Sequence, residues 1–566
     1  MKAYFFILKI ILYTFIFLGI FNSSHAKVSK FNYDAKNISN YFSGLVSFDD
    51  FDYEDSQTFF KKLDNFENKN TGHSSKFLQS LVNLGKYNQA YRYAKKLEEN
   101  KTSNFESNIF LTLYELKKQN YIKAQSYADK LKPDPKHLLI YDIIKISINT
   151  WVKLAQSNNI RDIELLDQAH PAYSNLIMIQ KVFSNCYLKN AATEEKFKKF
   201  FENKESNFAR YNFFFSNYLY NNDRKEEAIK FIDSSSNKYP RNLLINQFAK
   251  SVRGLEKNNN LFNCQNISNV LAEIFYVLAN VLSSQNHYAL SNFYINLSKF
   301  LNPNFDSYNT LLAENFLVLK KNKNAKAIYK NLLDNGSVYK WYAAKQIANI
   351  MDQEKNTNSI NFLSNIYKKM KPEVHDTFDF ANFLRNKENY KKSIELYSEI
   401  LGKITVEHKL YPAVLERRGM SYERINEWEL SEKDLLASLD IVPDEPYVMN
   451  YLAYTWVEKN KNIEKALDML RKANDLKKNN GYITDSLGWA LYKLNNFSEA
   501  KKYLQMAIVL MPTDPIINDH FADCLWMNND KIQARYYWRN VLKSEDADEE
   551  LKIKAKRKLL FGLENT

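Results

Sequence analysis

A repeat of 34 residues is the feature that most constrains what this chain can fold into. In the block that begins at Gly481, positions 7, 8, 20, 24, 27 and 32 hold Leu487, Gly488, Ala500, Leu504, Ala507 and Pro512. The next block, 34 residues further on, holds Phe521, Ala522, Ala534, Trp538 and Val541 at the matching positions. A period of this length predicts an array of small units in which each unit packs against its neighbour.

The same period is fainter in the rest of the chain. Ser56, Ala90 and Ala124 follow it near the N-terminus. The register is weak in three segments, residues 135–205, 241–270 and 336–374, so whether these segments are true repeats stays open. Position 20 is serine rather than alanine in several blocks, namely Ser56, Ser291, Ser393 and Ser431. Serine is small enough for this position, and the alternative is that these repeats are less regular.

Small residues explain how one repeat would fold. Gly488, Ala500 and Ala507 allow two antiparallel helices to approach closely, while larger residues fill the space between them. Pro512 ends the second helix because proline cannot continue it. Eleven glycines and eleven prolines in 566 residues are too few for a sheet-rich chain that needs frequent tight turns. We therefore predict an all-α fold, an α-solenoid or superhelix of helical hairpins.

The strength of the repeat also predicts the organisation of the chain. The parts in order are a signal peptide over residues 1–26, a degenerate N-terminal array over 27–270, middle repeats over 271–374, a regular C-terminal array over 375–542 and a capping helix over 543–566.

The first 26 residues are typical of a secretory signal peptide. Lys9 ends a basic segment, and an uncharged, mainly apolar stretch from Ile10 to Phe21 follows that is too short to span a bilayer. Ser24 and Ala26 are the small residues that a signal peptidase recognises, so we expect cleavage after Ala26 and export. An uncleaved anchor that begins at Ala3 is the alternative, and membrane contact is expected only in that case.

Three cysteines, Cys186, Cys264 and Cys524, are too few and too widely spaced for a disulfide framework. We expect them to be buried free thiols. A bridge between Cys186 and Cys264 is the alternative, but a linear array would normally keep residues more than two repeats apart from meeting.

The period, the small residues and the terminal proline together resemble the tetratricopeptide repeat over nearly all of the chain after residue 40. Three stretches, residues 447–454, 481–489 and 514–526, look like exported tetratricopeptide-repeat proteins of Gram-negative bacteria, notably of the alphaproteobacterial branch. That family includes envelope lipoproteins that act as adaptors for a carboxy-terminal processing protease and its cell-wall hydrolase substrates. The resemblance implies a periplasmic location and protein partners in the envelope. It does not imply a lipid anchor, because the cysteine that would be lipidated is missing.

The charge pattern argues against a nucleic-acid partner. The net charge of +14 is mostly interleaved with acidic residues, and no basic stripe with aromatic side chains is seen. The densest basic patch comprises Lys552, Lys554, Lys556, Arg557 and Lys558. We interpret this patch as the solvated face of a capping helix rather than as a nucleic-acid or lipid contact.

Sequence motifs for metal, nucleotide or hydrolase chemistry are missing, so we expect no enzyme activity and no cofactor. His520 and Cys524 lie one helical turn apart beside Asp519 and Asp523, which would be the best candidate for a metal face. Two ligands with neighbouring carboxylates fall short of a recognisable metal site.

The best candidate for function is the concave surface, which the resemblance assigns to the first helix of each hairpin. Its positions in the last repeats predict a partner-binding strip of Asn450, Tyr454, Tyr482, Asp485, Trp489, Asp519, His520, Asp523 and Trp526. Aromatic rings provide contact area, and the polar side chains suit a peptide backbone or a basic side chain. The alternative is that half of the aromatic residues belong to the core between hairpins.

Two classes of function follow. The first is a non-catalytic periplasmic scaffold or adaptor that binds a protein or peptide, with a protease or cell-wall hydrolase as a candidate partner. The second is an envelope enzyme whose catalytic region is hidden in the poorly repeating segments. Those segments are shorter than an ordinary catalytic domain, which favours the scaffold.

Overall fold

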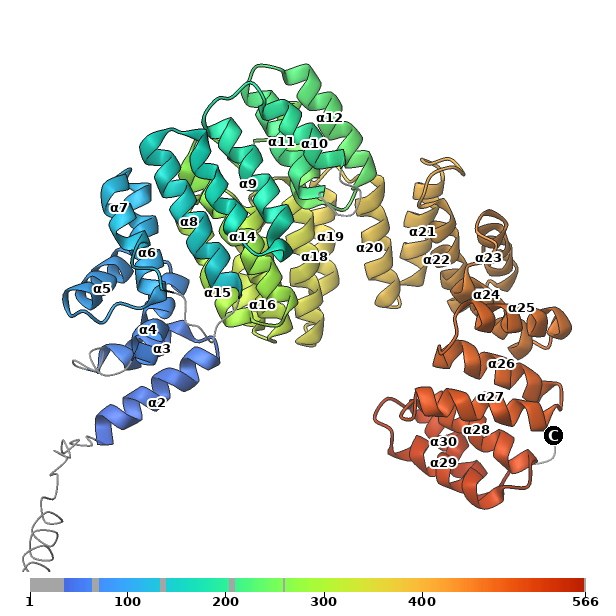
Figure 1. Ribbon diagram of the computed structural model, residues 1–566. Coiled ribbons are helices and arrows are strands. Elements are labelled where there is room, and N and C mark those ends of the chain that lie inside the picture. The colour runs from blue at the N-terminus through green and yellow to red at the C-terminus, as the bar shows by residue number, and fades with distance from the viewer. Residues whose placement is uncertain (1–34, 64–70, 133–138, 203–208, 258–259, 564–566) are drawn as a thin grey trace, which may run out of the picture. The chain divides into compact units, whose positions relative to one another are not determined.

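A computed structural model describes residues 35–63, 71–132, 139–202, 209–257 and 260–563 of the protein. These residues form helices without a strand, apart from one isolated bridge between Asn260 and Phe305. The predicted all-α solenoid of helical hairpins is therefore confirmed, while the predicted signal peptide lies outside the described residues. The chain forms two compact units, unit 1 over Met1–Asn356 and unit 2 over Thr357–Thr566 (Figure 1).

Unit 1 begins with hairpins and ends on a long helix. Its elements are α2 (Ala35–Asp49), α3 (Tyr53–Lys61), α4 (Thr71–Asn83), α5 (Tyr87–Glu99), α6 (Phe105–Lys117), α7 (Tyr121–Ala128), α8 (Leu139–Ser157), the 3-10 helices η2 (Ile160–Gln168) and η3 (Pro171–Tyr173), α9 (Ser174–Tyr187), α10 (Thr193–Glu202), α11 (Ala209–Asn221), α12 (Lys225–Lys238), α13 (Leu243–Val252), α14 (Ile267–Ser284), α15 (Tyr288–Leu301), α16 (Ser307–Val318), α17 (Asn322–Leu332) and α18 (Ser337–Gln353).

Unit 2 is the more regular part. Its helices are α19 (Ser359–Lys369), α20 (Val374–Asn386), α21 (Tyr390–Leu401), α22 (Tyr411–Arg424), α23 (Trp428–Ile441), α24 (Pro446–Glu458), α25 (Ile463–Leu476), α26 (Gly481–Lys493), α27 (Phe497–Leu510), α28 (Pro515–Met527), α29 (Lys531–Lys543) and α30 (Glu549–Phe561). The helices pair in order from α20–α21 to α28–α29, and α30 packs on the last pair.

The small residues lie where the two helices of a hairpin meet, as predicted. Ala500 and Ala507 on α27 are fully buried, and a Cβ atom on Gly488 of α26 would lie 2.6 Å from Cγ of Leu504. The four serines at position 20, Ser56, Ser291, Ser393 and Ser431, are also fully buried. The Ser291 hydroxyl donates a hydrogen bond of 2.8 Å to the Ala279 carbonyl. A buried serine at this position therefore has a partner for its hydroxyl group.

Asparagine in the left-handed conformation joins the two helices in each of the four hairpins from α22–α23 to α28–α29. Asn426, Asn460, Asn495 and Asn529 have φ values of 64°, 52°, 62° and 65°. Asparagine tolerates this conformation better than most residues, and it lets the chain reverse directly after the first helix. The next amide, that of Asn496, donates to the Leu491 carbonyl at 2.9 Å and so closes the end of α26. This spacing is a repeat signal that the sequence analysis missed.

Two of the weakly repeating segments depart from the hairpin pattern. Within residues 135–205, α8 is followed by the 3-10 helix η2 instead of a second α-helix. Within residues 241–270, α13 stands without a second helix, and an irregular segment leads to α14. The faint register in these segments therefore reflects real changes in local structure.

A central hairpin, α14–α15, holds unit 1 together. Helix α14 packs against α6, α8, α9, α15 and α16, and α15 also contacts α4 and α6 (Figure 1). The Tyr87 hydroxyl donates to the Asn296 carbonyl at 3.2 Å, and the Asn296 amide donates to Asn83 at 3.1 Å. Unit 1 is therefore folded back on itself, and its early helices meet residues more than 200 positions later.

One buried ion pair lies in this central packing. The Arg210 guanidinium of α11 donates to both carboxylate oxygens of Glu273 on α14, at 2.6 and 2.8 Å, and to the Ser307 hydroxyl of α16 at 2.8 Å. Its guanidinium carbon lies 4.1 Å from the centre of the Tyr276 ring. Helix α14 is also long and apolar enough to cross a membrane, but 67% of it is buried inside the unit. Its length and composition thus reflect its central place in the core.

The expectation that all three cysteines are free thiols is wrong for two of them. Cys186 at the end of α9 and Cys264 in the segment before α14 form a disulfide, with Cα atoms 5.8 Å apart. The reason is the folding back of unit 1, which brings α9 against α14 although the two cysteines are 78 residues apart. Cys524 is a buried free thiol, as expected.

The close contact at Gly488 predicts a specific loss of stability. Gly488→Ala places its new methyl group against Leu504, and we expect it to lower the free energy of unfolding by about 1–3 kcal/mol. Gly402→Ala is the matched control, because Gly402 has right-handed φ and ψ and a Cβ atom there would meet nothing closer than 3.6 Å. Urea unfolding of both variants checks this, and equal stabilities would show that the assigned register is wrong.

Candidate functional site

The predicted partner-binding residues lie on α24, α26 and α28, the first helices of the last three hairpins. Their exposure differs widely. Tyr482 is 55% exposed, and Asn450, Tyr454 and Trp526 are partly buried. The other five are buried, namely Asp485, Trp489, Asp519, His520 and Asp523. The strip is thus an interior polar cluster with a few accessible residues at its edge.

His520 is the centre of this cluster. Its Nδ1 atom lies 2.9 Å from Oδ2 of Asp485 on the preceding first helix. The imidazole ring stacks on Trp489, with ring centres 4.0 Å apart and planes 10° apart, and Trp489 stacks in turn on Tyr492 at 4.7 Å. The Trp489 indole N–H donates to Glu458 at the end of α24 at 2.5 Å. These contacts join three successive first helices.

Lys558 of α30 completes the cluster from the C-terminal side. Its ammonium donates to Oδ2 of Asp519 and to Oδ2 of Asp523, both at 2.7 Å, while the Trp538 indole N–H donates to Oδ1 of Asp523 at 2.9 Å. The prediction of a solvated basic face is therefore wrong for Lys558, whose side chain is only 20% exposed. Position alone could not reveal this, because the partners of Lys558 lie 35 and 39 residues earlier.

The surroundings of His520 and Asp523 raise the pKa values of both groups. Burial alone would lower the pKa of His520, but the charge and hydrogen bond of Asp485, with help from Asp519 and Asp523, raise it above its ordinary value of 6.5. Burial, followed by the charge of Asp519, raises the pKa of Asp523 to about 6 against the opposing effect of Lys558. Both groups therefore hold a proton more firmly in the folded protein than in the unfolded chain.

Among the described residues, no group of three or more histidine, cysteine, aspartate or glutamate side chains is placed so that it could hold a metal ion. His520 and Cys524 are directed to different partners. The Cys524 thiol donates to the Phe497 carbonyl at 3.5 Å, whereas His520 faces Asp485.

Exposed apolar side chains lie beside the polar cluster at the start of the same helices. Tyr447 on α24, Tyr482 on α26 and Ile516 on α28 occupy position 2 of three successive repeats and are 48%, 55% and 51% exposed. We call these three residues the position-2 ladder. Tyr447 and Ile516 were missed by the sequence analysis, although an apolar residue recurring at position 2 was a visible signal.

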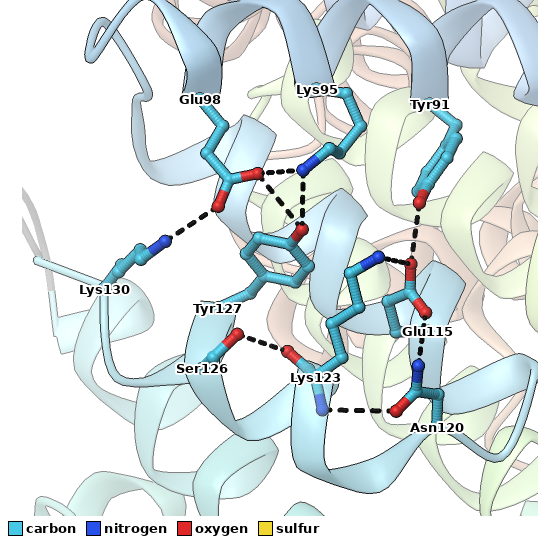
Figure 2. A network of polar contacts seen from close by, with 9 residues as sticks. All are labelled: Tyr91, Lys95, Glu98, Glu115, Asn120, Lys123, Ser126, Tyr127 and Lys130. Carbon is cyan, nitrogen blue, oxygen red and sulfur yellow. Dashed lines mark hydrogen bonds and ion pairs between the residues drawn. The ribbon is translucent and has the colours of Figure 1, made fainter.

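Unit 1 contains a separate polar network on α5, α6 and α7, which Figure 2 shows. Glu98 accepts hydrogen bonds from Lys95, from Lys130 at 2.8 Å and from the Tyr127 hydroxyl at 3.1 Å. These bonds outweigh burial and lower the pKa of Glu98 to about 2. Beside it, Glu115 accepts from the Tyr91 hydroxyl at 2.7 Å. The carboxylates face partners on these three helices and in the segment directly after α7, so the network joins neighbouring hairpins.

Comparisons with known proteins agree with the repeat pattern. No family model matches the chain. A tetratricopeptide repeat-containing protein of Pseudomonas aeruginosa is 29% identical over 135 residues, which is 23% of this chain. The match spans 22% of the length of that relative, so the whole relative is not represented here.

Two solved structures also share the helical-repeat character. TTC0263, a tetratricopeptide protein of Thermus thermophilus, is 15% identical and covers 33% of this chain and 100% of its own, with a TM-score of 0.29. The Cut9–Hcn1 hetero-tetramer of the APC/C is 14% identical and covers 93% of this chain and 96% of its own, with a TM-score of 0.38. With TM-scores this low, the assignment rests on the helices and register of this chain itself.

The 34-residue period, the buried small residues and the paired helices together define the class of fold. The protein is an α-solenoid built from hairpins of the tetratricopeptide-repeat type.

The raised pKa values predict that unit 2 becomes less stable as the pH rises. The contribution of Asp523 to the free energy of unfolding decreases as the pH rises from 3.8 to about 6. The contribution of His520 is fully present below about pH 6.5 and is lost as the pH rises through its pKa in the folded protein. We expect a lower free energy of unfolding at pH 8 than at pH 5. Urea unfolding followed by tryptophan fluorescence suits this test, because five of the seven tryptophans lie in unit 2.

Asp485→Asn is the control for this pH dependence. It removes the charge that raises the pKa of His520, so the difference in stability between pH 5 and pH 8 should shrink. A difference of unchanged size in this variant, or a stability that rises from pH 5 to pH 8 in the wild type, would contradict the assignment.

Proposed function

We propose that the protein is a non-catalytic adaptor of the periplasm that binds protein partners through the first helices of unit 2. The fold supports a repeat scaffold of the kind that serves protein–protein interaction. The candidate partner is an envelope protease or a cell-wall hydrolase, as the sequence resemblance implies.

The observation that carries the proposal is the position-2 ladder. Tyr447, Tyr482 and Ile516 expose apolar surface at the same position of three successive first helices. Tyrosine is among the residues that contribute most to protein interfaces, because its ring buries area and its hydroxyl still forms a hydrogen bond. A regular row of such residues suits an extended peptide or a loop of a partner.

Unit 1 supports the same choice of surface. Its early helices pack against the α14–α15 hairpin, so residues that would face a partner in an open array contact the chain itself. Unit 2 has no such central hairpin among its described residues, and its successive first helices contact each other from α24 to α28.

The disulfide supports the proposed compartment. Disulfides persist in oxidising compartments such as the bacterial periplasm and are rare in the cytosol. A bond between Cys186 and Cys264 therefore suits an exported protein, in line with the signal peptide proposed for residues 1–26.

The position-2 ladder predicts the effect of two substitutions on partner capture. Tyr447→Ser combined with Tyr482→Ser should weaken crosslinking to envelope partners by about 30-fold or more, because interface tyrosines of this kind contribute more than about 1 kcal/mol each. Met506→Ser with Val509→Ser on α27 is the control, since these side chains are 50% and 75% exposed on the second helix of a repeat. Equal capture by both variants would refute the assignment of the surface.

Export predicts the chemical state of the protein in cells. Protein from the envelope fraction should begin at Lys27, and Cys186 and Cys264 should react with an alkylating reagent only after reduction and unfolding. N-terminal sequencing and thiol labelling check both points. A chain that begins at Met1 would favour the anchor, and a reactive Cys264 without reduction would place the protein in a reducing compartment.

A further inference from the structure

Position 5 of the last three first helices carries an acceptor oxygen in every repeat. Asn450 on α24, Asp485 on α26 and Asp519 on α28 occupy this position. In each of these side chains the Oδ1 atom is buried and has no hydrogen-bond partner among the described residues, and the two aspartates are only 5% and 7% exposed. A buried acceptor without a donor is costly, so three of them at one repeat position indicate a ligand that brings donors.

The charge around these acceptors is negative. Helices α24, α26 and α28 carry one lysine, Lys493, whose ammonium lies 5.2 Å from the centre of the Trp489 ring. The same helices carry four carboxylates, namely Glu458, Asp485, Asp519 and Asp523. The second helix α29 has the opposite bias and carries only cations, namely Lys531, Arg535, Arg539 and Lys543. The face formed by the first helices is therefore complementary to a cationic ligand.

The cations of the protein itself use one oxygen of each aspartate at position 5. His520 lies 2.9 Å from Oδ2 of Asp485, and Lys558 donates to Oδ2 of Asp519 and to Oδ2 of Asp523 at 2.7 Å. A carboxylate can accept about four hydrogen bonds, so each aspartate has room for a second cation. The cluster stays negative even when His520 is protonated, because the carboxylates outnumber His520 and Lys558.

Two partly exposed tyrosines lie beside these carboxylates. Burial, followed by the charges of Glu458 and Asp485, raises the pKa of Tyr454. Burial, followed by the charge of Asp523, raises the pKa of Tyr492 in the same way. Both rings are partly reached by solvent. A ligand that turns these rings aside gains access to the carboxylates, and the rings then offer their faces to its cations.

The acceptors adjoin the position-2 ladder. Positions 2 and 5 are three residues apart on one helix, so Tyr482 and Ile516 lie about one turn from Asp485 and Asp519. Helices α26 and α28 contact each other, and packed helices lie about 8–10 Å apart. A polyproline II chain advances about 9 Å in three residues and returns to the same side. Ligand side chains i and i+3 therefore match successive repeats.

We propose that Asp485 and Asp519 bind two cationic side chains, lysine or arginine, that lie three residues apart in an extended segment of the partner. The proposal rests on the adaptor function proposed above and adds the chemistry of the partner. Each cation donates to an Oδ1 atom that has no donor within the described part of the protein, and apolar side chains next to the cations pack on the position-2 ladder.

Peptide selection tests this chemistry with a defined probe, a phage library of random dodecapeptides, and the full chain as bait. The wild type should enrich peptides with two lysine or arginine residues three positions apart. Asp485→Asn with Asp519→Asn keeps the size of both side chains but removes their charge, so it should lose the enrichment of cations and still select apolar peptides through the ladder. Asp468→Asn with Asp475→Asn is the control, which removes the same charge from exposed positions of α25 and should select like the wild type.

A synthetic copy of one selected peptide provides the second test. Its analogue carries citrulline for arginine or acetyllysine for lysine and so loses both charges. By fluorescence polarisation, the analogue should bind the wild type about 100-fold more weakly, since each charge-assisted bond contributes about tenfold or more. It should bind the Asp485→Asn, Asp519→Asn variant nearly as well as the charged peptide does.

The outcomes separate this proposal from the adaptor function. Selected peptides without cations would overturn the present proposal and leave the adaptor function standing. Equal affinity of the charged peptide and its analogue for the wild type would overturn it as well, and this comparison needs no variant to fold. Failure of the wild type to select any peptide would contradict the adaptor function too.

Discussion

Every other feature of the fold depends on how closely the two helices of a hairpin approach. At Gly488, Ala500 and Ser291 the space is so small that a larger side chain would push the helices apart. That short distance also sets the spacing between successive hairpins, so a side chain on one first helix can reach the next. Asp485 therefore meets His520, and Lys558 meets Asp519, across separations of 35 and 39 residues.

The sequence predicts contacts between residues that are close along the chain better than contacts between residues that are far apart. The 34-residue register predicts contacts within a hairpin, and it correctly places the nine candidate residues on α24, α26 and α28. It does not predict exposure, because His520 and Asp523 are covered by side chains whose contribution emerges only in three dimensions. It also cannot predict the bond between Cys186 and Cys264, since a repeat describes neighbours along the array and not the folding back of unit 1.

Both units bury charged groups, and in both the charges join helices that are distant in sequence. Arg210 pairs with Glu273 in unit 1, and Lys558 lies between two aspartates in unit 2. Such pairs add little to stability compared with apolar packing, because removing charges from water is costly. An unpaired charge in the same place would be strongly unfavourable, however, so each pair penalises any shift of one helix against the other. We infer that apolar packing stabilises the stack while these pairs define which helix contacts which.

The central place of α14–α15 has a consequence for the order in which the chain acquires structure. Unit 2 consists mainly of contacts between adjacent hairpins, which form quickly because little chain entropy is lost in closing short loops. In unit 1, α4 and α6 complete their packing only when α15 is available, some 200 residues later. A chain that is synthesised or translocated from its N-terminus therefore presents the apolar faces of its first helices for longer than those of its last. The early part of unit 1 is where assistance by a chaperone has the largest effect.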